Sequence, residues 1–343
     1  FLSSLAPCRN LTSAAFGFPL CKAAPLSQRL CGVEFPSPVG LAAGFDKNGR
    51  LVGLMPCLSF GHVEVGSTTL RPFAGNPKPR LHRLVASRSI VVNYGLKNEG
   101  VKELLSHFRP DNVPIPVGIS VARTNDGQSG GLELGVADYV SCVRACLHSG
   151  MDFLTLNVSC PNTEDGRPFE HDHALEALLS ALDSVAIDCP VFIKVSPDLT
   201  PAQMIALADV AAGHSFVSGL VLGNLTKIKD SLHPTDEVRA QTCKGGMSGA
   251  PCARRSMTLT SLCYSRYGRR FVLVGCGGIL TAQDAYDRIR AGASLLQIVT
   301  ALIFNGPQVV SEMHRGLIEL LRADGFRCIS EAVGTKLVNT DDV

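Results

Sequence analysis

The chain has 343 residues, 45% of them hydrophobic and 18% charged, which is enough to bury the core of one large domain or two ordinary ones. A formal net charge of +2 gives no strong attraction for nucleic acid, and no apolar run approaches the roughly 18 residues of a membrane-spanning helix. The thirteen cysteines have no zinc-type spacing, and His171 and His173 lack a third ligand, so the sequence predicts reduced thiols and no metal site.

Residues 1–30 are predicted to be an extension in front of a folded domain at 31–343. The beginning of the chain contains Arg9, Lys22 and Arg29 but no acidic residue before Glu34, and it is rich in Ser, Ala and Leu. This composition fits three alternatives: a remnant of an organelle-targeting segment, an amphipathic segment at a membrane surface, or a disordered tail.

A regular alternation of strand and helix patterns begins near residue 36. The predicted strands are eight short apolar, β-rich runs at 39–43, 62–66, 115–121, 152–158, 190–195, 216–222, 271–275 and 294–299. The predicted helices between them lie at 99–108, 137–149, 172–186, 201–212, 255–267, 281–291 and 307–323. Eight buried-type strands alternating with helices predict a (β/α)8 barrel, with an open doubly wound sheet as the alternative.

The longest irregular stretches mostly follow the carboxyl ends of predicted strands. They are expected at 67–98, 123–135, 159–171 and 223–250. In a barrel this is the rim at which ligands bind, and long loops there commonly bind or cover a ligand.

Three glycine-rich segments predict a cofactor that carries a phosphate. GCGGI at 275–279 and IVTAL at 298–302 end the last two predicted strands, and GGMSGAP at 245–251 offers a third turn. Barrels often bind phosphate through backbone N–H groups after strands seven and eight, and Gly277 and Gly278 allow a close approach of the backbone.

Two lysines occupy positions that favour an anionic or electron-rich ligand. Lys47 follows the first strand, and Lys194 lies inside the apolar run VFIKVS. A buried ammonium needs a negative partner, which could be a core carboxylate, although the neighbouring strands contain few acids. A reduced flavin would satisfy Lys194, because negative charge develops at one edge of its ring.

Carboxamides and one thiol complete the predicted site. Asn93, Asn157, Asn162 and Asn224 all lie at or just beyond strand ends, and carboxamides suit heterocycles that both donate and accept hydrogen bonds. Cys160 lies in the polar loop SCPNT and is the candidate general base, provided that the site lowers a thiol pKa of about 8.5, with Lys47 as one candidate cation.

Taken in order, these motifs closely resemble the dihydroorotate dehydrogenase family over about residues 30–335. The segments that carry the resemblance are AAGFDKNG (42–49), VEVGSTTLRPFAGNPKPRLHRL (63–84), NVSCPNT (157–163), IKVSPDLT (193–200), GGMSGAP (245–251) and VGCGGI (274–279). The resemblance is greatest to the membrane-associated, quinone-reducing class 2. It implies an FMN-containing (β/α)8 barrel that oxidises dihydroorotate to orotate in pyrimidine synthesis.

The resemblance also implies residue roles, with Cys160 at the position of the catalytic base. The implied FMN ligands are Ala42, Ala43, Gly44, Lys47, Ser67, Ser120, Asn157, Lys194, Gly223, Gly249, Gly277, Gly278, Val299 and Thr300. The implied substrate ligands are Lys47, Asn93, Tyr94, Gly95, Leu96, Asn157, Asn162, Asn224 and Leu225.

Several positions depart from the class 2 pattern. Cys160 replaces the usual serine, as in the soluble class 1 enzymes, and the 92–98 segment is one residue short. Ser120, Leu225 and Val299 stand where asparagine, threonine and tyrosine are usual. Two alternatives therefore stay open beside a quinone reductase: the same oxidation with a soluble acceptor such as fumarate, or a non-catalytic barrel that binds flavin or pyrimidine. The expected location is the surface of the mitochondrial inner membrane, with the cytoplasm as the alternative.

Overall fold

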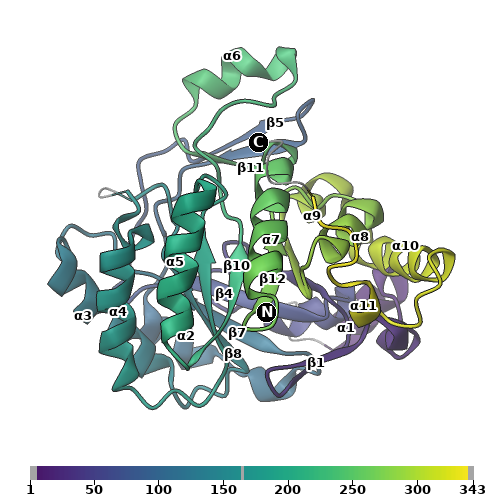
Figure 1. The fold of residues 1–343 in the computed structure, drawn as a ribbon, viewed down its shortest axis with the longest axis horizontal. Coiled ribbons are helices and arrows are strands. Elements are labelled where there is room, and N and C mark those ends of the chain that lie inside the picture. The colour runs from purple at the N-terminus through teal and green to yellow at the C-terminus, as the bar shows by residue number, and fades with distance from the viewer. Residues whose placement is uncertain (1–5, 164–165, 339–343) are drawn as a thin grey trace.

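The computed structural model describes residues 6–163 and 166–338, which form a closed barrel of eight parallel strands (Figure 1). The barrel strands are β3 (Val39–Leu41), β4 (His62–Thr68), β7 (Val117–Val121), β8 (Phe153–Asn157), β9 (Val191–Val195), β10 (Val217–Leu222), β12 (Val272–Cys276) and β13 (Leu295–Ile298). All eight predicted strands are confirmed. The pairing of β13 with β3 closes the barrel and excludes the open sheet.

Helices between the strands cover the outside of the barrel. They are α2 (Val101–His107), α3 (Leu132–Cys146), α4 (Asp172–Asp183), α5 (Pro201–Gly213), α7 (Ala253–Tyr267), α8 (Ala282–Arg290) and α10 (Val309–Ala323), followed by the short α11 (Ile329–Ala332). Thr200 and Thr281 form complete capping boxes at the starts of α5 and α8, and both helices begin within one residue of the predicted starts at 201 and 281. Helix α3 begins earlier than the expected residue 137, after the positive-φ Gly131.

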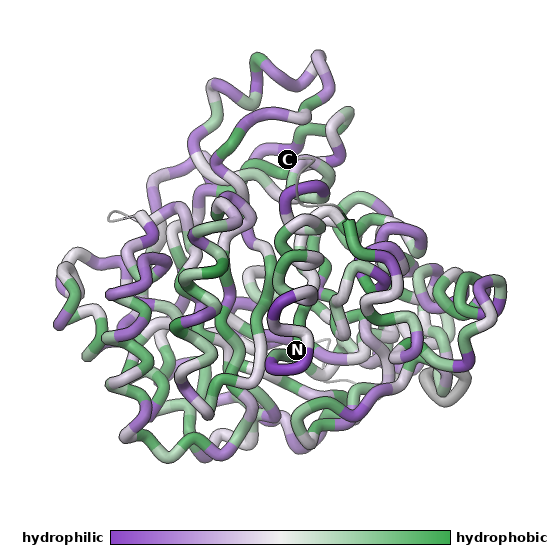
Figure 2. The backbone as a smooth tube through the Cα atoms, viewed as in Figure 1, coloured by the Kyte–Doolittle hydropathy of each residue, from purple (hydrophilic) through white to green (hydrophobic). Residues whose placement is uncertain are grey.

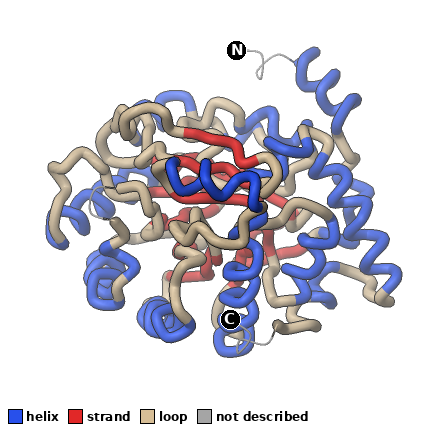
Figure 3. Tube along the Cα trace, turned by 90° about the horizontal axis from the view of Figure 1, so that it is seen from above, coloured by secondary structure: helices blue, strands red, loops and turns tan. Residues whose placement is uncertain are grey.

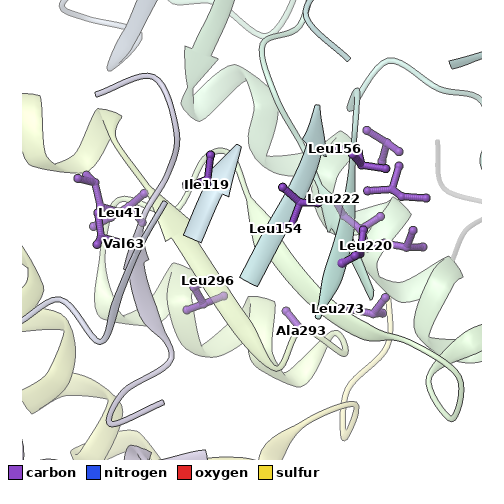
Figure 4. Packing of buried hydrophobic residues seen from close by; sticks show 14 of the residues in the cluster. Leu41, Val63, Ile119, Leu154, Leu156, Leu220, Leu222, Leu273, Ala293 and Leu296 are labelled. Carbon is purple, nitrogen blue, oxygen red and sulfur yellow. The ribbon is translucent and has the colours of Figure 1, made fainter. Parts of the chain in front are cut away.

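Alternation along each strand separates an outer apolar layer from a partly polar interior. Leu154, Ile193 and Leu296 point outward and pack against the helices (Figure 4 shows Leu154 and Leu296). Their neighbours Phe153 and Phe192 point inward at the amino-terminal end of the barrel. Because side chains alternate with a period of two, the polar residues inside these strands face the barrel interior rather than solvent.

A small sheet lies over the carboxyl ends of the barrel strands, where irregular loops were expected. It consists of β5 (Leu81–Leu84), β6 (Ser89–Val92) and β11 (Gly246–Gly249). Helix α6 (Pro234–Thr242) contacts β5, and helix α9 (Thr300–Asn305) contacts β11. The sheet order is β11-β6-β5, Figure 1 shows β5 and β11 above the barrel, and Figure 3 looks down on this side of the molecule. The turn predicted at GGMSGAP is wrong in part, because Gly246–Gly249 is a strand whose partner β6 is distant in the sequence.

The α6 segment projects beyond this sheet and is largely hydrophilic (Figure 2). Short turns of 3-10 helix complete the description at η2 (Leu20–Leu26), η3 (Val52–Leu58), η4 (Pro110–Asn112), η5 (Pro168–Glu170) and η6 (Ala250–Cys252).

The amino-terminal segment packs on the outside and on the amino-terminal end of the barrel. Helix α1 (Ala6–Phe16) contacts η3, and the hairpin of β1 (Gln28–Leu30) and β2 (Val33–Phe35) lies under the amino-terminal end of the barrel. Phe35 closes that end against Phe153 and Phe192. Ala23 and Leu26 are fully buried, whereas Leu11 on α1 is 73% exposed.

Candidate active site

A cavity of about 400 Å³ lies between the carboxyl ends of the barrel strands and the small sheet. Most of the residues predicted for cofactor and substrate line it. They are Ala42, Ala43, Gly44, Lys47, Ser67, Tyr94, Gly95, Leu96, Asn157, Cys160, Asn162, Lys194, Asn224, Leu225, Gly249, Gly277, Gly278, Val299 and Thr300. Segments from almost the whole length of the chain therefore converge on one space.

Three predicted ligands, Ser120, Gly223 and Asn93, lie behind the cavity wall instead. The Ser120 hydroxyl is fully buried and lies 2.7 Å from the hydroxyl of Ser67, which does line the cavity. Gly223 has a φ of +136°, and a Cβ there would lie 1.9 Å from the Cys276 carbonyl oxygen. Asn93 accepts a 3.0 Å hydrogen bond from Asn76. These positions support cavity residues and do not contact the space directly.

Other lining residues were not predicted from the sequence. They are Phe45, Gly66, Leu81, Ile90, Val92, Lys97, Ser248, Cys276, Ile279, Gln297, Ile298 and Ile303. Gln297 carried a readable signal, since it is a polar residue inside the apolar run LLQIV, as Lys194 is in its own strand. Nothing in the sequence marked Leu81, Ile90 and Val92 as cavity residues, because they line the cavity only as parts of the small sheet that covers it.

One end of the cavity has the properties of a phosphate site. The N–H groups of Gly277 and Gly278 follow β12 and have no hydrogen-bond partner among the residues that the structure describes. Thr300 begins α9, and its hydroxyl lies 2.8 Å from that of Ser248. Gly249 has a φ of +84°, and a Cβ there would lie 2.2 Å from a carbonyl oxygen of Arg88. Free backbone donors beside hydroxyl groups suit a phosphate.

The other end of the cavity is cationic around Lys47. The Lys47 ammonium donates a 2.5 Å hydrogen bond to the Gly44 carbonyl and lies 4.5 Å from the centre of the Tyr94 ring. Burial lowers the pKa of Lys47, and repulsion from Lys97 lowers it further. An anionic ligand would relieve this repulsion, because two ammonium groups close together favour a negative charge between them.

Three carboxamides are held in fixed orientations between these two ends. The Asn157 amide donates to the Ser67 hydroxyl at 2.7 Å, and its oxygen accepts from Asn224 at 3.3 Å. Asn224 also donates to the Ser159 hydroxyl at 2.8 Å, while the Asn162 amide donates to the Val92 carbonyl at 2.8 Å. Their orientation is set before any ligand binds, which reduces the entropy that binding must overcome.

The thiol of Cys160 lies in the same wall, but its environment differs from the expected one. Burial raises the pKa of Cys160 to about 11, whereas the expectation was a lowered value. Lys227 and Arg167 are the cations that oppose this shift, and Lys47 is not among them. Lys227 also donates a 3.0 Å hydrogen bond to the Asn162 side-chain oxygen. The thiol is therefore neutral at pH 7, and the base form has to be generated from this state.

The fold and the cavity together define a (β/α)8-barrel protein with a candidate ligand site at the carboxyl ends of its strands. The family model of dihydroorotate dehydrogenase matches residues 25–321. The dihydroorotate dehydrogenase (quinone) of Thermobifida fusca is 40% identical over 321 residues, which cover 90% of this chain and 83% of that protein. The protein of the same name from Mycolicibacterium smegmatis is 40% identical over 310 residues, or 90% of this chain and 85% of the relative.

A solved structure agrees with these relatives. The crystal structure of ligand-free DHODH from Eimeria tenella has a TM-score of 0.82 and 28% sequence identity, covering 95% of this chain and 98% of the other. The chain belongs to the dihydroorotate dehydrogenase family.

Proposed function

We propose that this protein oxidises dihydroorotate to orotate for pyrimidine synthesis and transfers the electrons to a quinone. The observation that carries the proposal is the set of groups that line one cavity. A thiol, three oriented carboxamides and Lys47 line the same space as Thr300 and the free N–H groups of Gly277 and Gly278. The family membership supplies the substrate, and relatives named dihydroorotate dehydrogenase (quinone) support the acceptor.

FMN is the proposed cofactor, and the residues present fit it. Gly277, Gly278 and Thr300 would hold the phosphate, and Lys194 would face the ring from the barrel interior, where it is 3% exposed. A Cβ at Gly44 would meet no atom within 4 Å, so the cavity is open beside the backbone there. When bound, FMN would supply the acceptor for the substrate hydride and the route of the electrons to quinone.

The chain's own residues would orient the substrate and move one proton. Lys47 would pair with the substrate carboxylate, and Asn157, Asn162 and Asn224 would bond its ring amides. The Cys160 sulfur would take the proton from C5 while the hydride leaves C6, which forms the C5–C6 double bond of orotate. The small sheet over the cavity would exclude water during this step.

Peripheral attachment to a membrane is part of the proposal, because a quinone is a lipid-soluble acceptor. Within residues 6–163 and 166–338, no helix combines the length and apolar character needed to cross a bilayer. The exposed Leu11 on α1 supports a surface contact rather than a span. Location at the mitochondrial inner membrane stays a prediction.

The test is an anaerobic titration of the flavin-loaded protein. We expect dihydroorotate to bleach the flavin absorbance, and a soluble quinone analogue to restore it faster than fumarate does. A flavin-loaded sample that dihydroorotate leaves unbleached would contradict the proposal and favour the non-catalytic alternative. Faster reoxidation by fumarate would favour the soluble acceptor.

Salt is expected to weaken the binding of orotate, because the cavity opens into a basic groove. That groove is lined by Lys47, Lys78, Pro79, Arg80, Leu81, Tyr94 and Lys97. None of its four cations forms an ion pair with another described residue. Raising NaCl from about 0.01 M to about 1 M shortens the screening length from roughly 30 Å to 3 Å. We expect about a tenfold loss of orotate affinity across this range.

Titrations of the oxidised protein, followed by the flavin spectrum, measure this loss. Lys97→Gln should weaken binding at low salt and flatten the salt dependence. The uncharged methyl ester of orotate is the control, and its affinity should change little with salt. An identical salt dependence in the wild type and in Lys97→Gln would show that this cation does not attract the substrate.

A further inference from the structure

A fully buried carboxylate lies inside the barrel, one layer beneath the cavity. Glu64 on β4 is 0% exposed, and its Oε2 accepts hydrogen bonds from Gln297 at 2.7 Å and from Thr155 at 2.9 Å. Its Oε1 has no hydrogen-bond partner among the described residues. A buried carboxylate is costly unless it is paired, so a compensating charge must lie close by.

Lys194 provides that charge from the opposite wall of the barrel. Its ammonium lies 3.9 Å from Oε1 of Glu64 and donates a 3.3 Å hydrogen bond to Oε1 of Gln297. Gln297 therefore bridges the two ions, donating to the carboxylate and accepting from the ammonium. His62 adds no charge, because burial lowers its pKa to about 3.

The residues of this buried cluster differ in whether they reach the cavity. Lys194 and Gln297 line the cavity, whereas Glu64 and Thr155 line only a small void deeper in the barrel. The 3.9 Å separation is too long for a hydrogen bond, so Lys194 pairs with the carboxylate through its charge alone. Glu64 can therefore act on a ligand in the cavity only through Lys194 and Gln297 or through its field.

We propose that Glu64 is a positioning residue that, with Gln297, keeps the Lys194 ammonium in place beneath the flavin ring, and that the negative charge of Glu64 tunes the reduction potential of the bound flavin. This inference rests on the proposed function, which places the ring above Lys194. The positive charge of Lys194 favours the reduced, more negative flavin, and the negative charge of Glu64 one layer deeper offsets part of that effect. Neutralising Glu64 should therefore raise the potential, and removing the positive charge of Lys194 should lower it.

The experiment measures the midpoint potential of the flavin by reductive titration against a reference dye. Glu64→Gln preserves the size and the acceptor for Thr155, and we expect it to raise the potential by about 30 mV, a tenfold change for a two-electron couple. Lys194→Gln, which removes the ammonium that lines the cavity, is expected to lower it by at least as much. The opposite signs separate an electrostatic role from general damage to the fold.

Asp138→Asn is the matched control, because Asp138 is a buried acid bound to Thr124 and Arg71 and does not line the cavity. The midpoint potential of the flavin in this variant should equal that in the wild type. A wild-type potential in Glu64→Gln, or a rise in Lys194→Gln, would overturn the inference even if melting temperatures fell. A wild-type protein that binds no flavin would instead refute the proposed function.

Discussion

Cys160→Ala is expected to slow the reduction of bound flavin by dihydroorotate about 10²–10⁴-fold, the usual contribution of a general base. The sulfur lies in the cavity wall beside Asn162, and among the described residues Cys276 is the one other thiol, imidazole or carboxylate that lines the cavity. Stopped-flow absorbance under anaerobic conditions measures the rate. Flavin content and orotate affinity should stay close to wild type, because alanine removes only the proton acceptor. A rate within threefold of wild type would show that another group takes the proton.

The same reaction should have a distinctive pH profile. Burial raises the pKa of Cys160 to about 11, so the thiol is protonated through the neutral range and the base form grows with pH. We expect the rate of flavin reduction to rise about tenfold per pH unit above pH 7 and to level off near pH 11. Saturating dihydroorotate isolates this step. A profile that is flat from neutral to alkaline pH would contradict a thiol base with this pKa.

Two further variants test the environment of the thiol. Lys227→Gln keeps a side chain near Asn162 but removes a cation that lowers the pKa of Cys160, so its profile should move to higher pH. Cys160→Ser supplies the hydroxyl that is usual in class 2, and it should be faster than Cys160→Ala, with no levelling near pH 11. A serine variant as slow as the alanine variant would show that the loop is built specifically for a thiol.

Gly278→Ala is expected to abolish retention of FMN, with at least a hundredfold loss of affinity, about 2.7 kcal/mol. Gly278 has a φ of +74°, and a Cβ there would lie 2.4 Å from both Cα and Cβ of Ala253. The turn after β12 would have to move, and the free N–H groups of Gly277 and Gly278 would move with it. Fluorescence titration of the apoprotein with FMN measures the loss.

Gly325→Ala is the control for backbone strain alone. Gly325 has a φ of +80° at the end of α10, and a Cβ there would meet no atom within 4 Å. Both variants should lose stability of the order of 1 kcal/mol from the left-handed conformation, but only Gly278→Ala should lose the flavin. If both variants bind FMN equally at matched melting temperature, the turn does not hold the phosphate.

Most of the residues that line the cavity could be predicted from the sequence, because a parallel barrel brings the carboxyl ends of all its strands together. Knowing that Asn157, Cys160 and Asn224 follow strands was sufficient to expect them near one another. The sheet over the cavity could not be anticipated in this way. Its strand β11 is glycine-rich and pairs with β6, and the bonded pair Ser89 and Ser248 is 159 positions apart.

The acid that pairs with Lys194 could not be identified from the sequence either. Its buried position demanded a negative group, and the strands adjacent in sequence contain few acids. The acid is Glu64 on β4, which faces β9 across the interior rather than beside it in the sheet. Only closure of the barrel makes these two residues neighbours.

The eight strands and most of the helices between them could be predicted from the sequence, because their periodic apolar patterns depend on residues that are close together in the chain. Tertiary structure alone decided the sheet over the cavity, the pairing of Glu64 with Lys194 and the raised pKa of Cys160. Each of these depends on what distant segments place around a residue, since desolvation and charge are properties of the enclosed volume and not of the local chain.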